Sequence, residues 1–250
     1  MSPTRSRSSW LLPIALLFAC NPPVPPELEG GDTPKKEEQR GRKEQEAKPK
    51  KATEKTAAAW TGFFTGTLPC ADCPGIRTEL WVRPDSTFIL GQRYIDRDSM
   101  AFAQFGKWRV VNGRLAVGSG TDKPDLWKQT PKGLVKVDEN GQEWALAPKM
   151  ALDRQGTSAK IPVMRVTGAY VFHEGAHSFT PCGSYREFPL AVSGGDLGLE
   201  KLYTKRFKKK DDKLYVELEA TVGTAEAQEG AAKDEYVFPK KLVRVLNVCP

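Results

Sequence analysis

The chain has 250 residues, of which 39% are hydrophobic and 28% are charged, and its formal net charge is +7. Basic and acidic residues are interspersed, and two aspartates directly follow the densest basic run, Lys205 to Lys210, so the composition does not favour a nucleic-acid partner. The apolar run from Trp10 to Ala19 is about half the roughly 20 residues that a membrane-spanning helix needs, which excludes a permanent span there.

The first residues have the pattern of an export signal. Arg5 and Arg7 precede the apolar run, which ends in Leu17-Phe18-Ala19-Cys20. This ending resembles the bacterial lipobox, in which the cysteine is lipidated before cleavage. We therefore expect a signal peptide over residues 1–19 and a membrane anchor through lipid on Cys20. Asn21 follows the cysteine in place of an aspartate, which favours an outer-membrane address.

Residues 20–58 lack apolar periodicity. Four prolines lie between Pro22 and Pro26, and mixed lysine, arginine, glutamate and alanine follow them. Such a segment cannot bury enough apolar surface to offset its conformational entropy. We expect a disordered, charged tether.

Beyond the tether, hairpin signals are frequent, and two Asn-Gly dipeptides stand between short apolar runs. This dipeptide suits the type I′ turn of a tight β-hairpin. The predicted strands are Lys107–Val111 and Arg114–Val117 around Asn112-Gly113, and Leu134–Val137 and Glu143–Leu146 around Asn140-Gly141.

Towards the C-terminus one strand and one helix are indicated. Leu214, Val216 and Leu218 alternate with polar residues, as in a half-buried strand whose other face, including Glu217, points to solvent. A short helix is expected between Asp196, as N-cap, and Phe207. The many short strands predict an all-β protein of barrels or sandwiches.

A polar stretch from Lys149 to Ile161 lacks strand character and divides the folded region in two. All tryptophans beyond the tether precede it, and both histidines follow it. The predicted organisation is a first β domain over residues 59–148, a linker over 149–162 and a second β domain over 163–250.

With Cys20 assigned to lipid, four of the five cysteines remain: Cys70, Cys73, Cys182 and Cys249. Export makes disulfides the expected state, and four cysteines allow three connectivities. The domain boundary favours Cys70 with Cys73 and Cys182 with Cys249.

The Cys70-Ala71-Asp72-Cys73 motif allows three interpretations. It is a disulfide that closes a turn, a pair of thiolates that captures Cu(I), or a redox-exchange motif. Pro74-Gly75 argues against the helix that a redox motif usually begins. No nearby methionine or histidine completes a metal set.

His173-Glu174-Gly175-Ala176-His177 matches the His-Glu-x-x-His pattern of zinc hydrolases. That chemistry needs a helix to place both histidines on one face. Gly175 and the strand-like flanks predict a hairpin instead, with incidental surface histidines that lie near one another across the turn and bind metal weakly at most.

The segment Gly66 to Leu80, with Pro69-Cys70-Ala71-Asp72-Cys73-Pro74-Gly75-Ile76 at its centre, resembles the NlpE family of copper-homeostasis and envelope-stress lipoproteins. Phe105-Gly106-Lys107-Trp108 resembles a Gly-x-Trp strand of that family. The second half resembles the second domain of its two-domain members, through Phe179 to Cys182, Arg186 to Leu190, Leu199 to Tyr203 and Cys249.

The resemblance covers about residues 60–250 and implies a lipocalin-like N-terminal barrel and a C-terminal barrel of the oligonucleotide/oligosaccharide-binding (OB) type. It implies a disulfide between Cys182 and Cys249. It also implies that copper, surface contact, faulty oxidation or faulty lipoprotein delivery is relayed to the Cpx two-component pathway.

The leading hypothesis is a non-enzymatic sensor and adaptor of the outer membrane. It would signal to an inner-membrane sensor kinase, face the periplasm as a monomer, bind no nucleic acid and require no cofactor. The alternatives are a Cu(I) chaperone that uses Cys70 and Cys73, a small-ligand carrier and, remotely, a zinc hydrolase.

Overall fold

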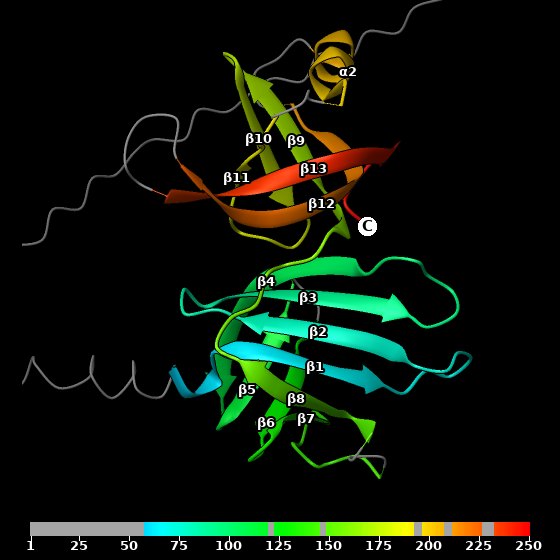
Figure 1. Cartoon of the computed structure of the whole chain (residues 1–250), viewed down its shortest axis with the longest axis vertical. Coiled ribbons are helices and arrows are strands. Elements are labelled where there is room, and N and C mark those ends of the chain that lie inside the picture. The colour runs from blue at the N-terminus through cyan, green and yellow to red at the C-terminus, as the bar shows by residue number, and fades with distance from the viewer. Residues whose placement is uncertain (1–57, 120–122, 146–148, 193–196, 208–211, 227–232) are drawn as a thin grey trace, which may run out of the picture. The chain divides into compact units, whose positions relative to one another are not determined.

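The computed structural model describes residues 58–119, 123–145, 149–192, 197–207, 212–226 and 233–250 (Figure 1). The predicted signal peptide (1–19), the predicted lipidation site Cys20 and the predicted tether (20–58) lie outside these residues, apart from residue 58. Within the described ranges, no helix has the length and apolar character that crossing a membrane requires.

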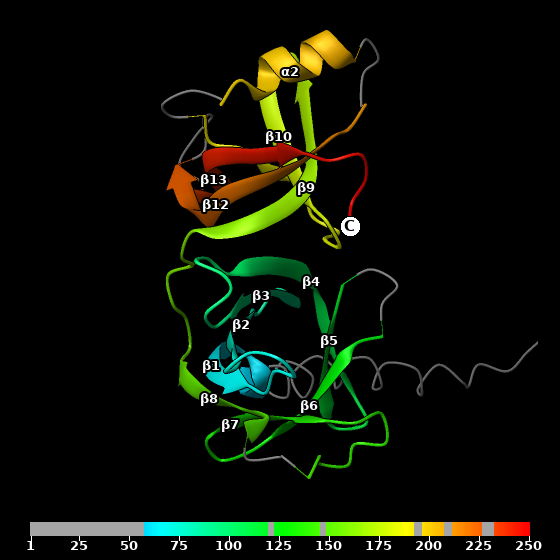
Figure 2. The same ribbon diagram turned by 90° about the vertical axis from the view of Figure 1, so that its right-hand side faces the viewer.

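The first half of the described chain is a closed antiparallel barrel. Strand β1 pairs with β2 and β8, and β4 pairs with β5, so the sheet returns on itself (Figures 1 and 2). Closure removes the open edges that expose unpaired backbone groups. The strands are β1 Gly62–Leu68, β2 Ile76–Val82, β3 Thr87–Tyr94, β4 Phe102–Val111, β5 Arg114–Gly118, β6 Asp125–Gln129, β7 Gly133–Val137 and β8 Ala151–Gly156.

The second half is a smaller barrel with one helix. Strand β9 pairs with β10 and β12, β12 pairs with β13, and a bridge between Leu190 and Val237 joins the chain after β11 to β13. The helix α2 packs against β9 (Figure 2). The elements are β9 Met164–His173, β10 Ala176–Pro181, β11 Phe188–Pro189, α2 Leu199–Arg206, β12 Leu214–Glu226 and β13 Lys233–Val245. The predicted all-β fold of two barrels is confirmed.

Local sequence explains several elements. Asn112 and Gly113 both have positive φ, 49° and 71°, and join β4 to β5 as predicted for a type I′ turn. Leu214, Val216 and Leu218 point into the second core, each at most 1% exposed. The helix begins at Leu199 with Gly198 as its N-cap, so the predicted cap at Asp196, which lies outside the described residues, is wrong.

Two predictions about the end of the first barrel are also wrong. Glu143 makes only an isolated bridge to Val137, and β7 pairs with β8 instead of with residues 143–146. The stretch taken as a linker over 149–162 contains β8, which closes the barrel between β7 and β1. This strand reads as polar because Leu152 is its one fully buried residue, while Asp153, Arg154 and Gln155 face solvent.

Each barrel has its own hydrophobic core. Side chains from all around the first barrel fill its interior, including Phe64, Phe88, Trp108 and Trp127. The second core extends beyond its own barrel and includes Trp81, Ile89 and Phe105 from β2, β3 and β4 of the first. The two barrels therefore share an apolar contact as well as a chain connection.

Candidate functional site

Cys70 and Cys73 lie in the loop between β1 and β2 and are joined by a disulfide, with 5.3 Å between their Cα atoms. The loop contacts the turn after β3. Arg97 Nη2 lies 2.8 Å from Asp72 Oδ2 and donates to the Asp72 carbonyl at 2.9 Å. No helix begins at this motif, in agreement with the expectation from Pro74-Gly75. The bond closes a local turn on an exposed loop.

Cys182 and Cys249 are also joined by a disulfide, although 67 positions separate them. Cys182 directly follows β10, and its backbone N–H donates to the Thr167 carbonyl on β9 at 2.9 Å. Cys249 lies four residues beyond the end of β13. The bond therefore ties the end of the last strand to the turn after β10.

This turn lies against the first barrel. Gly183 has a φ of 76°, and a Cβ added there would come within 2.5 Å of the Ser119 side chain, which follows β5. Only glycine fits such a close approach without displacing its neighbour. The Cys182–Cys249 bond thus lies at the contact between the two barrels, whereas the Cys70–Cys73 bond belongs to the first barrel alone.

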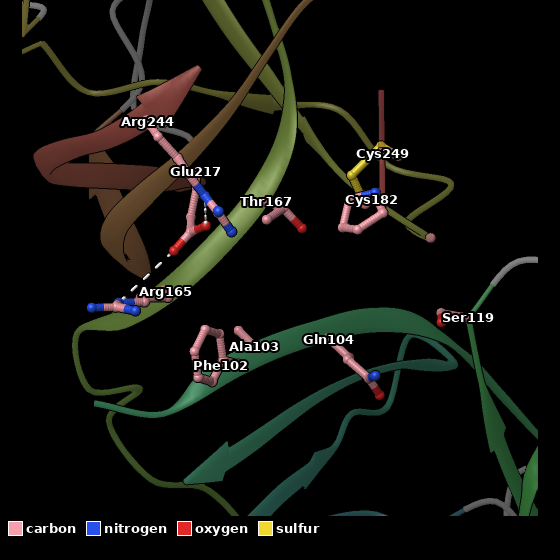
Figure 3. A pocket seen from close by; sticks show the side chains of 12 residues that line it. Phe102, Ala103, Gln104, Ser119, Arg165, Thr167, Cys182, Glu217, Arg244 and Cys249 are labelled. Atoms are coloured by element: carbon pink, nitrogen blue, oxygen red, sulfur yellow. Dashed lines mark hydrogen bonds and ion pairs between the residues drawn. A yellow bond between two sulfur atoms is a disulfide. The ribbon is translucent and has the colours of Figure 1, made fainter. Parts of the chain in front are cut away.

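A cleft of about 450 Å³ lies beside the Cys182–Cys249 bond. Gln104 and Ser119 of the first barrel line it together with polar and charged side chains of the second (Figure 3). Both cysteines of the disulfide are part of its wall, with Thr167 lying between them and the charged side chains.

Glu217, a charged residue that lines this cleft, was not predicted from the sequence to be buried. Glu217 is 2% exposed, although the alternation along β12 assigns it to the solvent face. Its Oε2 accepts from Arg244 Nε at 2.7 Å, and its Oε1 lies 3.8 Å from Arg165 Nε. A buried carboxylate requires such partners. Alternation of apolar and polar residues shows which residues share a face of a strand. It does not show which element covers that face.

A second charged cluster joins the barrels. Glu235 Oε2 on β13 accepts from Arg83 of the first barrel at 2.7 Å and from Arg186 at 2.9 Å. Asp85 lies 3.8 Å from both arginines. Partial burial raises the pKa of Asp85, but hydrogen bonds from Thr87 and the charges of Arg83 and Arg186 outweigh it and hold the pKa below its ordinary 3.8.

The His-Glu-x-x-His match lies on a hairpin, which excludes the helical zinc-hydrolase arrangement. Glu174 and Gly175 form the turn between β9 and β10, with φ values of 49° and 84°. His177 pairs with Phe172, and His173 pairs with Ala176, so the two histidines point to opposite faces. They do not lie together across the turn, which corrects the prediction that they could share a metal.

His177 is also more than an incidental surface residue. Its Nδ1 lies 2.8 Å from the Tyr170 hydroxyl, and its ring lies 4.9 Å from that of Phe172. Among the described residues, no group of three or more histidine, cysteine, aspartate or glutamate side chains has the geometry of a metal site.

Two features of the structure bear on redox chemistry and on ligand binding. The long-range disulfide, the charged cluster and the apolar contact all lie at the same junction between the barrels. The interior of the first barrel is occupied by its own aromatic side chains, which counts against a small-ligand carrier.

Two family models match the chain in tandem: the NlpE N-terminal domain over residues 64–145 and the NlpE C-terminal OB domain over residues 160–247. A curated relative, the lipoprotein NlpE of Escherichia coli (strain K12), is 26% identical over 130 residues, which cover 51% of this chain and 55% of the relative. The chain thus spans about half the length of the curated relative that it matches.

Two solved structures are also similar. The crystal structure of the Cpx pathway activator NlpE from Escherichia coli is 22% identical, with a TM-score of 0.32, and the match covers 72% of this chain and 93% of that one. A putative lipoprotein from Shewanella oneidensis is 27% identical, with a TM-score of 0.34, over 38% of this chain and 89% of that one. Since the tandem family models together match more than half of its residues, the chain belongs to the NlpE family of lipoproteins and carries its N-terminal domain followed by its C-terminal OB domain.

Proposed function

We propose that this protein is a non-enzymatic sensor and adaptor for envelope stress, which reports to an inner-membrane sensor kinase of the Cpx type. Membership of the NlpE family supports the general role. The observation that carries the redox part is the position of the Cys182–Cys249 bond, which fastens the end of the last strand at the contact between the two barrels.

The proposed mechanism is a shift between a closed and a loosened junction. With the bond formed, the second barrel covers Trp81, Ile89 and Phe105 on the outer face of the first. Without the bond, the segment after β13 is no longer held at the turn after β10. A disulfide that closes a loop of this length contributes about 4 kcal/mol, a large part of a typical domain's 5 to 15 kcal/mol. Uncovered apolar side chains on the first barrel would then provide the docking surface for the kinase.

The test compares the two disulfides in living cells with an envelope-stress reporter. Replacing Cys182 and Cys249 by serine is expected to raise the reporter signal, and replacing Cys70 and Cys73 by serine is not. Equal protein amounts in the membrane fraction are the control. A silent reporter in the Cys182→Ser, Cys249→Ser strain would remove the redox part of the proposal.

We also propose that lipid on Cys20 anchors the protein in the outer membrane, with both barrels facing the periplasm. Labelled palmitate should enter the wild-type chain and not a Cys20→Ser variant, and membrane fractionation should move the variant to the soluble fraction. Recovery of the wild type with the inner membrane would contradict the address.

Copper capture by Cys70 and Cys73 is a second candidate, because both sulfurs lie on an accessible loop where a metal ion could reach them. The bond must first be reduced, since the thiolate is the ligand. A Cu(I) titration of the reduced protein, with the Cys70→Ser, Cys73→Ser variant as control, tests this role. Binding weaker than micromolar would dispose of it.

A further inference from the structure

We propose that the cleft beside the Cys182–Cys249 bond is a recognition site for small thiols that carry carboxylates, and that it directs them to this disulfide. The inference deepens the redox part of the proposed function, on which its biological use rests. Its chemistry can be measured on the purified chain without any signalling partner.

The cleft wall combines a disulfide with positively charged groups. One cavity presents a disulfide together with the guanidinium groups of Arg165 and Arg244 (Figure 3). Carboxylates are the natural partners of guanidinium groups, and a sulfur nucleophile is the natural partner of a disulfide. A ligand that uses both features must carry both groups.

The buried Glu217 orients both arginines of the cleft. This carboxylate holds Arg244 through Nε, which leaves the outer nitrogens of that guanidinium without a role in the bond. Arg165 Nε is buried without a hydrogen-bond partner among the described residues and lies 3.8 Å from Glu217 Oε1. The terminal carboxylate of Pro250 also lines the cleft, so recognition rests on the outer nitrogens of Arg244, which can take a ligand carboxylate, and not on net charge.

The two cysteines of the cleft differ in their accessibility to an incoming thiol. Cys249 is exposed and Cys182 is half-buried, so an incoming thiolate reaches Cys249 Sγ more easily. The thiolate attacks Cys249 Sγ, the bond between the two cysteines breaks, and Cys182 leaves as a thiolate with the electron pair. A second thiol, as its thiolate, attacks the sulfur of the first, and Cys249 leaves as a thiolate. Two small thiols are oxidised to one disulfide, the protein bond is reduced by two electrons, and the cysteine thiolates take up the released protons.

The experiment measures the rate of reduction of each disulfide in the full chain by alkylation and mass spectrometry. The probes are glutathione, which carries carboxylates, and 2-mercaptoethanol, which carries none. The variants are Arg244→Gln and, as a charge-matched control away from the cleft, exposed Arg109→Gln on β4. The ratio of wild-type to variant rates for one thiol cancels the intrinsic reactivity of that thiol.

We expect Arg244→Gln to slow reduction of Cys182–Cys249 by glutathione about fivefold at low salt, the order expected for one charge near a protein surface. Reduction by 2-mercaptoethanol, whose thiolate carries no carboxylate, should slow clearly less, and reduction of Cys70–Cys73 by either thiol should be unchanged. Arg109→Gln should have no effect, and Arg244→Lys should restore most of the rate. In the wild type, salt should slow glutathione more than 2-mercaptoethanol, which tests the proposal without any variant.

Equal slowing of both thiols by Arg244→Gln would overturn the proposal, because the arginine would then act on a thiolate common to both reactions instead of on the carboxylate of the ligand. An unchanged rate with glutathione, or a glutathione rate without salt dependence, would also overturn it. These outcomes would leave the sensor proposal standing, since that proposal fails only if the reporter ignores the loss of the disulfide.

Discussion

The two disulfides of this protein differ in what they connect. Cys70–Cys73 spans 3 positions and joins neighbours within one exposed loop of the first barrel. Cys182–Cys249 spans 67 positions and fastens the end of β13 beside a cleft that both barrels line. The first bond shapes a loop whose ends β1 and β2 already hold together. The second joins segments that are far apart in the sequence and that strands β9, β12 and β13 bring together.

The fold, and not the cysteine motif, determines which of the two bonds can report on the junction between the barrels. The Cys-x-x-Cys motif is the more conspicuous feature of the sequence. Yet a bond within one loop changes little beyond that loop when it is reduced. The bond at the junction between the barrels shares that junction with the apolar contact of Trp81, Ile89 and Phe105 and with the charged cluster around Glu235.

The largest expected effect comes from removing each bond in turn. Replacing Cys182 and Cys249 by serine should lower the free energy of unfolding by about 4 kcal/mol, and replacing Cys70 and Cys73 by about 2 kcal/mol, because the entropy removed from the unfolded chain grows with loop length. Urea denaturation followed by far-UV circular dichroism measures both. Equal losses for the two pairs would break the comparison.

The position of these bonds could be inferred from sequence only in part. The cysteine count and the domain boundary favoured the pairing that the structure contains, and Asn112-Gly113 correctly located a hairpin because its positive φ values are a local property. Glu217 was assigned to solvent, and Arg83 gave no sign of its partner Glu235, since the two are 152 positions apart. The cleft depends on such distant pairs, so local patterns could not reveal it.

The first barrel shows the same limit within a single domain. The Asn140-Gly141 signal suggested a second hairpin, but the chain turns through bonds to Asp138 and leaves Glu143 with one bridge. Strand β8 was missed because one buried leucine, Leu152, gives no periodicity to detect. Its place is set by pairing with β1 and β7, which are tertiary interactions.

A second prediction tests whether the junction depends on the long-range disulfide. Glu235→Gln should lower stability by about 2 kcal/mol, because charge-assisted bonds to Arg83 and Arg186 are lost. The same substitution at Glu219, whose partner Lys241 is 3.8 Å away and largely exposed, should cost less than about 0.5 kcal/mol. Chemical denaturation of both variants provides the measurement.

The informative step is to repeat Glu235→Gln without Cys182 and Cys249. Arg186 lies four residues beyond Cys182, so loss of the bond should loosen its hold on Glu235 and make the substitution less costly. A double-mutant cycle measures this coupling. Strict additivity would mean that the charged cluster is independent of the disulfide.

A third prediction concerns acid. The folded-state pKa of Asp85 lies below its ordinary value, so its contribution to stability is present above that value and is lost as the pH falls through the folded-state value. Asp85→Asn should therefore cost up to about 1 kcal/mol at pH 7 and progressively less below about pH 4. Denaturation across this range, with exposed Asp153→Asn as control, tests it. A penalty that grew in acid would have the wrong sign.

The smallest effect is expected at the Cys70–Cys73 loop. Arg97 is 49% exposed and Asp72 68% exposed, so their ion pair at 2.8 Å competes with water on both sides. Arg97→Gln should change stability by less than about 0.5 kcal/mol. Arg186→Gln removes the same charge but leaves Glu235, whose side chain is 12% exposed, with one arginine fewer, so it should cost clearly more.

These two arginine variants test the difference between the two disulfides with single substitutions near each bond. If Arg97→Gln were as costly as Arg186→Gln, the Cys70–Cys73 loop would contribute to stability well beyond its own turn, and reduction of its bond would also reach the rest of the barrel. If only Arg186→Gln is costly, the two bonds differ because their surroundings differ. A redox change would then act on the fold through Cys182 and Cys249, because buried charge, apolar contact and a long-range bond meet at that junction.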